Sequence, residues 1–396
     1  MSLTNTPSAN RLHIGLFGKR NSGKSSLINA LTNQDTALVS GVAGTTTDPV
    51  YKAMEIHGIG PCMFIDTAGF DDGGELGEMR VQKTKEALLK TDVALLLFSG
   101  DDFTLELEWL ESLRKNKTPV IAVVNKADLL EDAGAFCWKV ENQSKLKPAL
   151  VSAKSGAGVK ALIETIVREM PEGFESESIT GHLVSPNDVV LLVMPQDIQA
   201  PKGRLILPQV QTIRDLLDHK CVVVSTTVDL LEQSLETLKK PPKLIITDSQ
   251  AFQPVYEKKP LESLLTSFSV LFAEYKGDIQ EFVKGAEAID SLTEQSHVLI
   301  AEACTHAPLA EDIGREKIPR ALKKRFGDRL NVSVVSGVNF PEDLSGYDLI
   351  IHCGACMFNR KYVLSRIERA KSQGVPITNY GVALAKLTGI LSKITY

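Results

Sequence analysis

The sequence predicts an α/β protein of three consecutive domains, at residues 8–172, 180–265 and 266–396. Three observations support this fold class. Short apolar segments of strand length alternate with helical segments along the chain, which is typical of parallel sheets with helical crossovers. A polar stretch, "MPEGFESESITGH", interrupts this alternation, which then starts again. Finally, 396 residues are enough for two or three domains that each bury a core.

Composition limits the class of protein. The net charge of −5 gives no positive field that would attract nucleic acid, so we expect no nucleic-acid partner. The apolar runs are too short to cross a bilayer, and "MSLTNTPSANR" lacks the apolar core of a secretory signal. We therefore expect no membrane association and a cytoplasmic location. Three of the six cysteines are isolated, and we expect core thiols at Cys62, Cys137 and Cys221.

The first domain begins with a phosphate-binding pattern. "LHIGLFGKRNSGKSSLINALT" reads as strand, glycine-rich loop and helix, and Gly18 to Ser25 fit G-x-x-x-x-G-K-S. Backbone N–H groups of such a loop surround phosphates at a helix N-terminus. Lys24 would reach the β- and γ-phosphates, and the Ser25 hydroxyl would coordinate Mg²⁺. The residues expected at the phosphates are Gly18, Asn21, Ser22, Gly23, Lys24, Ser25 and Ser26.

Three further motifs identify the base. "CMFIDTAGF" supplies Asp66 for Mg²⁺ and Gly69, whose N–H can sense the γ-phosphate. "VIAVVNKAD" ends another strand with Asn125, Lys126 and Asp128. A carboxylate there accepts the N1–H and N2–H₂ donors of guanine, which adenine does not offer. "ALVSAKSGAG" places a backbone N–H against guanine O6, with the residues Ser152, Ala153 and Lys154. The four motifs in this order predict a site for GTP or GDP.

At these residues the chain resembles the translation-factor-related GTPases, particularly the branch that acts in tRNA modification and ribosome assembly. "GVAGTTTDP" looks like the first switch of that branch, where Thr46 would close on Mg²⁺. The resemblance implies hydrolysis of GTP to GDP and phosphate, with Lys24, Asn21 and Thr46 as catalytic residues. Phe70 stands where many GTPases carry the glutamine that orients water, and it cannot do so.

Asn21 matches the loop asparagine of GTPases in this branch that are activated by potassium. The resemblance implies that K⁺ replaces an arginine finger. An asparagine that only tolerates the turn geometry of the loop is the other interpretation, and the sequence leaves both open.

The middle and last domains repeat the strand and helix pattern. In the middle domain, strands "NDVVLLVMP", "CVVVSTT" and "KLIITDS" predict a small parallel sheet without a catalytic cluster, suited to dimerisation through an exposed edge. A helical stretch, "PLESLLTSFSVLFAEYKGDIQEFVKGAEAIDSL", leads into the last domain. There, "HVLIAEA", "NVSVVSG", "YDLIIHC" and "VPITNYG" predict a doubly wound sheet. Ligands gather at the carboxyl ends of such strands, where Cys304 and Cys353 lie.

Three cysteines in this last domain predict a metal or redox site. Cys353 and Cys356 are three residues apart, so a helical turn would place both thiolates on one face. Cys304, at the end of another strand, could complete the face. A redox C-x-x-C, a zinc site with His352 or His306, and an iron–sulfur cluster all fit this spacing.

The arrangement Cys304-Thr305-His306 followed by His352-Cys353-Gly354-Ala355-Cys356 is similar to the C-x-H…H-C-x-x-C signature of the HydF family, the maturation GTPases of iron-only hydrogenases. The resemblance implies a 4Fe–4S cluster on the three cysteines. It leaves the fourth ligand open among His352, His306, Glu302 and solvent, and the two histidines could instead serve the diiron precursor.

The resemblance also implies a function for the whole chain. It implies a P-loop GTPase domain, a small parallel-sheet dimerisation domain and a doubly wound iron–sulfur cluster-binding domain. Such a protein is a homodimer that carries a diiron precursor with CO, cyanide and dithiolate ligands to apo iron-only hydrogenase, beside radical-SAM maturation enzymes. The alternative is a tRNA-modification or ribosome-assembly GTPase with a structural zinc site.

Overall fold

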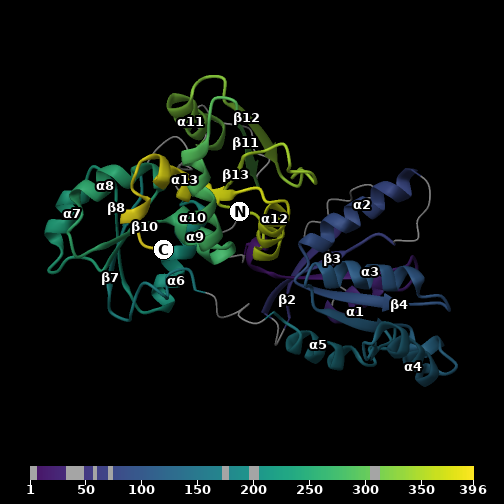
Figure 1. The fold of residues 1–396 in the computed structure, drawn as a ribbon. Coiled ribbons are helices and arrows are strands. Elements are labelled where there is room, and N and C mark those ends of the chain that lie inside the picture. Colours follow the sequence, from purple (N-terminus) through teal and green to yellow (C-terminus); the bar gives the residue numbers. More distant parts are fainter. Residues whose placement is uncertain are drawn as a thin grey trace. The chain divides into compact units, whose positions relative to one another are not determined.

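The computed structural model describes residues 7–32, 49–56, 60–69, 75–171, 178–195, 205–303 and 313–396. The chain divides into two compact units, residues 1–176 and 177–396, which are described separately (Figure 1). In the described residues, no helix is long and apolar enough to span a bilayer.

The first unit contains a six-stranded sheet in the order β2-β3-β1-β4-β5-β6. All neighbouring strands are parallel except β2 and β3. The strands are β1 (Leu12–Gly18), β2 (Val50–Ile56), β3 (Gly60–Asp66), β4 (Val93–Phe98), β5 (Val120–Val124) and β6 (Ala149–Leu150). The central strands β1 and β4 are buried along their whole length, because helices cover both faces of the sheet.

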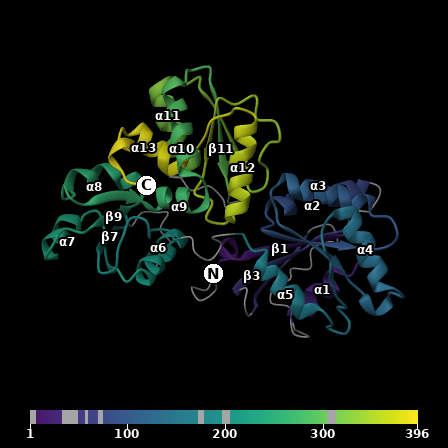
Figure 2. The ribbon, with the colours of Figure 1, turned by 60° about the horizontal axis from the view of Figure 1, so that its bottom comes forward.

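Two helical layers enclose this sheet. The helices are α1 (Lys24–Thr32), α2 (Glu75–Leu89), α3 (Thr104–Lys115), α4 (Ala133–Ser144) and α5 (Val159–Arg168). Helices α1 and α5 lie on one face, and α2 and α3 on the other (Figure 2). Each layer has its own apolar core, one around Leu27 and Leu162 and the other around Leu96 and Trp109. This sandwich fixes the carboxyl ends of the strands, from which the binding loops start.

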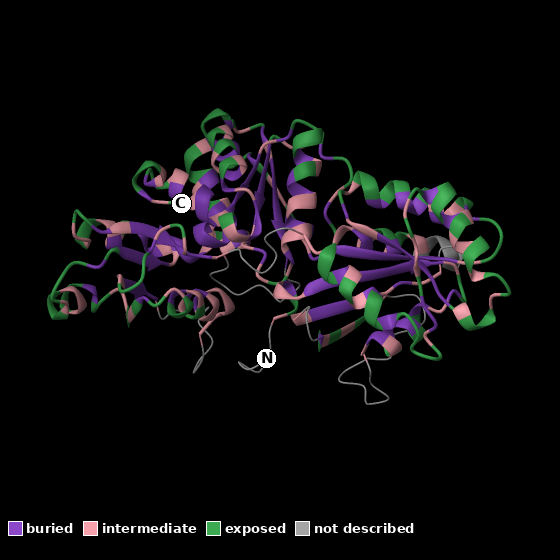
Figure 3. Cartoon of the chain, turned by 90° about the horizontal axis from the view of Figure 1, so that it is seen from below, coloured by how far each residue is buried: buried purple, intermediate pink, exposed green. Residues whose placement is uncertain are grey.

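The second unit contains two four-stranded parallel sheets, with the orders β10-β9-β7-β8 and β12-β11-β13-β14. The strands are β7 (Val189–Val193), β8 (Val222–Thr226), β9 (Leu244–Thr247), β10 (Leu264–Ser267), β11 (His297–Glu302), β12 (Asn331–Ser336), β13 (Leu349–His352) and β14 (Ile377–Asn379). The inner strands are buried, whereas the edge strands β8 and β12 are partly exposed (Figure 3).

Helices pack between and around these two sheets. They are α6 (Leu207–Asp218), α7 (Leu231–Thr237), α8 (Phe252–Lys258), α9 (Phe268–Lys276), α10 (Ile279–Glu287), α11 (Ile318–Phe326), α12 (Arg360–Ser372) and α13 (Tyr380–Leu387). A π-helical turn, Ile313–Lys317, precedes α11. Helices α9, α10 and α13 lie between the sheets, and a single apolar core joins residues of both (Figure 1).

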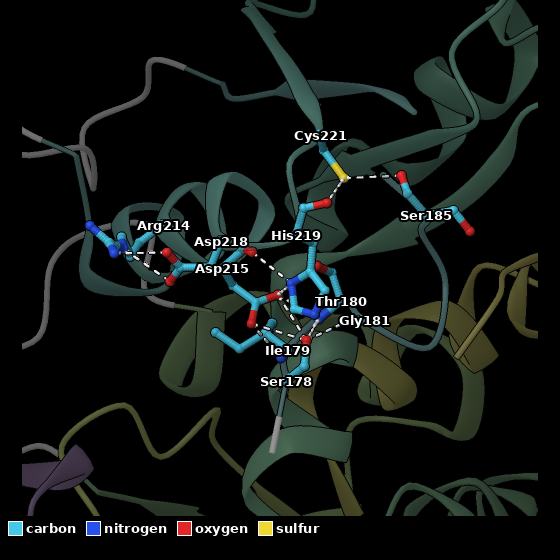
Figure 4. A network of polar contacts seen from close by, with 10 residues as sticks. All are labelled: Ser178, Ile179, Thr180, Gly181, Ser185, Arg214, Asp215, Asp218, His219 and Cys221. Atoms are coloured by element: carbon cyan, nitrogen blue, oxygen red, sulfur yellow. Dashed lines mark hydrogen bonds and ion pairs between the residues drawn. The ribbon is translucent and has the colours of Figure 1, made fainter. Parts of the chain in front are cut away.

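Asp215 on α6 anchors the first described residues of the second unit (Figure 4). Its carboxylate accepts hydrogen bonds from the Ser178 hydroxyl at 3.0 Å and from the Thr180 backbone N–H at 2.9 Å. The Thr180 hydroxyl donates to the same carboxylate at 2.5 Å, and His219 Nδ1 lies 3.7 Å from it. Bonds to an ionised acceptor are stronger than neutral ones, so the segment is firmly attached to the helix.

The structure confirms the α/β class and the parallel sheets, and corrects one element. The stretch from Pro260 that we expected to be helical first forms β10, which pairs with the edge of β9. Helix α9 starts only after Ser267, whose side chain accepts a hydrogen bond from Val270 N. An open strand edge and a serine cap therefore outweigh the helical pattern. The predicted boundary after residue 265 falls within β10. The division between the middle and last domains therefore stays a prediction.

Candidate functional site

The phosphate-binding loop runs from the end of β1 to the start of α1. The Lys24 ammonium donates to the carbonyls of Gly18 and Lys19, each at 2.9 Å, so it lies inside the curve of the loop. Gly23 has φ 92, and a Cβ there would come within 2.4 Å of Asn125 Nδ2. Only glycine fits at this position, because a side chain would be strained at this φ and would collide with Asn125. Among the residues that the structure describes, the buried Ser22 hydroxyl has no hydrogen-bond partner, as expected of a group that binds a ligand.

Two of the three residues predicted at Mg²⁺ lie together. The Ser25 hydroxyl donates to Asp66 Oδ2 at 2.6 Å, across 41 residues of sequence. A hydroxyl and a carboxylate oxygen at this spacing suit a hard cation. Gly69 follows on the same loop and is partly buried. Thr46, the predicted switch ligand, and Phe70 lie outside the described residues.

Asn125 connects three of the four motifs. Its Oδ1 accepts from Ala153 N at 3.1 Å, and its Nδ2 donates to Gly23 O at 3.2 Å. Beside it, the Lys126 ammonium donates to the backbone carbonyl of Asn21 at 2.6 Å. Both Lys126 and Asn21 adopt left-handed conformations, with φ of 61 and 58. The base loops and the phosphate loop are therefore held together by hydrogen bonds, as one preformed site.

Asp128 is the predicted guanine acceptor. It accepts from the Ser152 hydroxyl at 2.6 Å, and this hydrogen bond holds the pKa of the Asp128 carboxyl below its usual range. The side chain is exposed and stays ionised at neutral pH, as an acceptor for two donors must be. Lys154 and Ser26 are also exposed, on the loop after β6 and on α1.

Sequence reasoning missed one residue at this site. Glu106 on α3 is fully buried and lies 3.0 Å from the Lys19 ammonium of the loop. Burial raises the pKa of Glu106, although the contact with Lys19 opposes this. The pair ties the loop to α3. A glutamate within an apolar helix face was the available signal.

The second candidate site lies at the carboxyl end of β13. Residues 353–356 do not form a helical turn, and Ala355 adopts a left-handed conformation with φ 50. Cys353 Sγ instead accepts backbone N–H groups from Ala303 at 3.0 Å and from Ala355 at 3.4 Å. Burial raises the pKa of the Cys353 thiol to about 11. Because Ala303 follows the neighbouring strand β11, these contacts join the two strand ends where the cysteines were predicted.

His352 is 1% exposed and both of its ring nitrogens are engaged. Nδ1 lies 2.8 Å from the carbonyl of Cys353, so it carries the proton, and Nε2 accepts from Arg366 at 2.9 Å. Burial and the guanidinium lower the pKa of His352 to about 3. Both ring nitrogens are therefore occupied by protein contacts in this arrangement, and His352 as the fourth ligand stays a prediction.

Glu302, another fourth-ligand candidate, is also engaged. The Arg315 guanidinium donates to Glu302 Oε2 from Nε at 3.1 Å and from Nη2 at 2.8 Å. The Ser336 hydroxyl donates to the same oxygen at 3.1 Å. The Tyr380 hydroxyl lies 3.5 Å from Oε1.

Cys304 and His306 lie outside the described residues, so the predicted set of three cysteines is described only at Cys353 and Cys356. In the part of the chain that the structure describes, no group of three His, Cys, Asp or Glu side chains could hold a metal ion, and no cysteine forms a disulfide.

Two buried cations beside the cysteine loop were also missed. Arg366 lies in the buried stripe of α12 with Val363 and Ile367, and Lys276 ends the apolar run of α9. Each is 2% exposed. Burial lowers the pKa of Lys276 to about 8, while Cys356 opposes this shift. In the sequence, the signal for these buried cations was a charged residue at a helix position that otherwise carries apolar residues.

Three family models match the chain. Residues 280–395 match the hydrogen maturase F tetramerization domain, and residues 179–277 match the hydrogen maturase F dimerization domain. Residues 13–126 match the 50S ribosome-binding GTPase model. The first two models together cover most of the second unit.

Curated relatives match a smaller part of the chain. The tRNA modification GTPase MnmE of Endomicrobium trichonymphae is 35% identical over 187 residues, which is 46% of this chain and 38% of that protein. MnmE of Flavobacterium johnsoniae is 36% identical over 163 residues, 39% of this chain and 34% of that protein. The chain thus spans little more than a third of their length. A structure of Aquifex aeolicus Era aligns at 19% identity over 64% of this chain and 99% of that chain, with a TM-score of 0.35, too low to carry an argument.

Proposed function

This chain belongs to the hydrogen maturase F family, and from that premise we propose that it is a GTPase and a scaffold for a metal cofactor. It would bind a 4Fe–4S cluster and deliver a diiron precursor to apo iron-only hydrogenase. The observation that carries this proposal is the pair of family models over residues 179–277 and 280–395, next to a GTPase domain.

The GTPase part of the proposal rests on the residues of the first unit. Asp128 accepts the two guanine donors, and Lys24 neutralises charge on the phosphates. Ser25 and Asp66, whose side chains already meet at 2.6 Å, hold Mg²⁺. The glycine at position 23 lets the backbone approach the phosphates. Thr46 completes the metal site, and Asn21 holds the potassium ion that the family resemblance implies.

The scaffold part rests on the cysteine loop. Cys304, Cys353 and Cys356 would hold the cluster, which would supply iron with one labile coordination position. The surroundings suit an anionic group, because Lys276 and Arg366 are buried beside the loop and Arg366 Nε has no hydrogen-bond partner among the described residues. His352, Glu302 Oε1 and His306 remain candidates for the fourth position.

Self-association also supports this assignment. The dimerization model covers the sheet β10-β9-β7-β8, whose edge strand β8 is partly exposed, with Val222 52% exposed. We propose a homodimer through this sheet. Apo-hydrogenase and the radical-SAM maturation enzymes would be its other partners.

A tRNA-modification or ribosome-assembly GTPase with structural zinc is the second candidate. The MnmE relatives favour it, but they match less than half of this chain, whereas the hydrogen maturase F models match the rest. Binding to tRNA or ribosomes at moderate salt, with zinc in place of iron, would favour this candidate.

The test is anaerobic reconstitution of the full chain with iron and sulfide, followed by metal analysis and electron paramagnetic resonance. We expect about four irons per chain and a spectrum of a 4Fe–4S cluster. Serine at Cys304, Cys353 or Cys356 leaves two thiolates and a poorer site for a soft metal, so iron should fall to a small fraction of the wild-type value. GTP turnover should remain. Full iron in all three variants would contradict the proposal.

A further inference from the structure

Two buried cations lie on either side of the loop from Cys353 to Phe358. The Lys276 ammonium at the end of α9 donates to the carbonyl of Phe358 at 2.9 Å. The Arg366 guanidinium on α12 packs against the ring of the same Phe358, with 4.8 Å to the ring centroid. Each cation is 2% exposed, so both charges are removed from water.

Neither cation has a charged partner in the described structure. Within its described ranges, no carboxylate lies within ion-pair distance of Lys276 or Arg366. The Lys276 ammonium donates to one carbonyl, that of Phe358. Arg366 donates from Nη2 to Gly337 O at 2.5 Å and to the Tyr362 hydroxyl at 3.4 Å, and from Nη1 to His352 Nε2 at 2.9 Å. Its Nε is buried and has no hydrogen-bond partner in the part of the chain that the structure describes.

Aromatic rings provide the rest of the surroundings of Arg366. Phe340, Phe358 and Tyr362 each lie 4.8 Å from the guanidinium carbon. A cation–π contact contributes about 0.5–2 kcal/mol, but it does not neutralise the charge. Burying an isolated ion costs several kcal/mol. Two such ions at one loop form an environment that an anion would stabilise.

The thiols of the loop are the groups on which these charges act. Lys276 donates to the carbonyl of Phe358, two residues after Cys356, and Arg366 donates to the ring of His352, the residue before Cys353, each at 2.9 Å. The two cations therefore contact the chain on both sides of the two described cysteines. A purely structural role would not require two buried cations at this loop, because neutral side chains would fill the same space with a smaller desolvation penalty.

We propose that Lys276 and Arg366 are positioning residues that supply the positive charge for the anionic iron–sulfur group at Cys353 and Cys356, and that they raise its reduction potential. This inference rests on the proposed function. A nearby cation stabilises the reduced state, because that state carries one more negative charge. Removing the cation shifts the potential to more negative values.

The experiment is a redox titration of the reconstituted full chain, followed by electron paramagnetic resonance. The variant Lys276→Gln removes the charge but can still donate to Phe358 O. We expect the equilibrium constant for reduction of the cluster in this variant to fall about tenfold, which is a shift of ~59 mV to more negative potential for one electron. Lys276→Arg keeps the charge and should restore the wild-type potential. Lys284→Gln, the same change on the exposed face of α10, should leave the potential unchanged because water screens that charge.

Arg366→Gln provides an independent variant, matched by Arg369→Gln on the same helix, where the side chain is partly exposed. We expect a negative shift only in the first. Wild-type potentials in both Lys276→Gln and Arg366→Gln would overturn the inference and leave the proposed function standing. A wild-type chain that binds no iron would overturn the proposed function and this inference with it.

Discussion

At the scale of single residues, Asp128 decides the choice of base. We predict that Asp128→Asn shifts preference from GTP towards xanthosine triphosphate, because the amide offers a donor where xanthine has a carbonyl. The loss of two hydrogen bonds to a charged acceptor costs about 1.5–3 kcal/mol each. Nucleotide affinities measured by isothermal titration test this. The control is Glu131→Gln, which neutralises an exposed carboxylate shortly after Asp128 in the sequence. It should leave the affinities for GTP and for xanthosine triphosphate unchanged. Unchanged GTP affinity in Asp128→Asn would mean that the base pocket lies elsewhere.

Asn21 tests the role of potassium. We predict faster GTP turnover in KCl than in NaCl at equal ionic strength, because the ion replaces an arginine finger. Asn21 adopts φ 58, and its carbonyl accepts from Lys126. Asn21→Gly keeps this backbone and this bond but removes the side-chain oxygen. It should bind GTP as the wild type does and lose the response to K⁺. Equal rates in both salts for the wild type would leave Asn21 with only its turn geometry.

At the scale of elements, strand β8 is the edge that we expect to pair with a second chain. Val222 N donates to Asp188 O, and Thr226 O accepts from Met194 N, so the even-numbered residues of β8 face β7. Ser225 therefore directs its N–H to the open edge. Proline at this position removes an outward donor and leaves the β7 ladder complete.

We predict that Ser225→Pro is a folded monomer at micromolar concentration, whereas Ser225→Ala, which keeps the N–H, stays a dimer. Light scattering gives the mass, and circular dichroism shows that the fold is retained. A dimeric Ser225→Pro protein would place the interface on another surface of the second unit.

The elements also show which parts of the fold the sequence predicts and which it does not. The loop around Gly23 and Lys24 was predictable, because a backbone that curls around phosphates restricts which residues fit. Strand β10 was not, because β9 offers an open edge that local pattern does not reveal. The left-handed turn at Ala355 likewise lies beside the Cys353 sulfur, which accepts N–H groups from Ala355 and, across the sheet, from Ala303. Such features follow from tertiary packing rather than from periodicity.

At the scale of the whole molecule, the two compact units have separate apolar cores. The cores of the first unit contain only its own residues, and the larger core of the second unit draws on both of its sheets. A ligand that binds one folded unit stabilises that unit by about 2.7 kcal/mol at 100 times its Kd. If the units unfold independently, each ligand should act on one transition only.

We predict two transitions in calorimetry of the full chain. GDP with Mg²⁺ should raise the temperature of one of them, and iron reconstitution should raise the other. Lys24→Ala should abolish the response to GDP and keep the response to iron, because the lysine lies within the phosphate loop, where it donates to the carbonyls of Gly18 and Lys19. Cys353→Ser should do the reverse. If GDP instead raised both transitions equally, the units would unfold as one, and nucleotide binding would then be thermodynamically coupled to the cysteine loop.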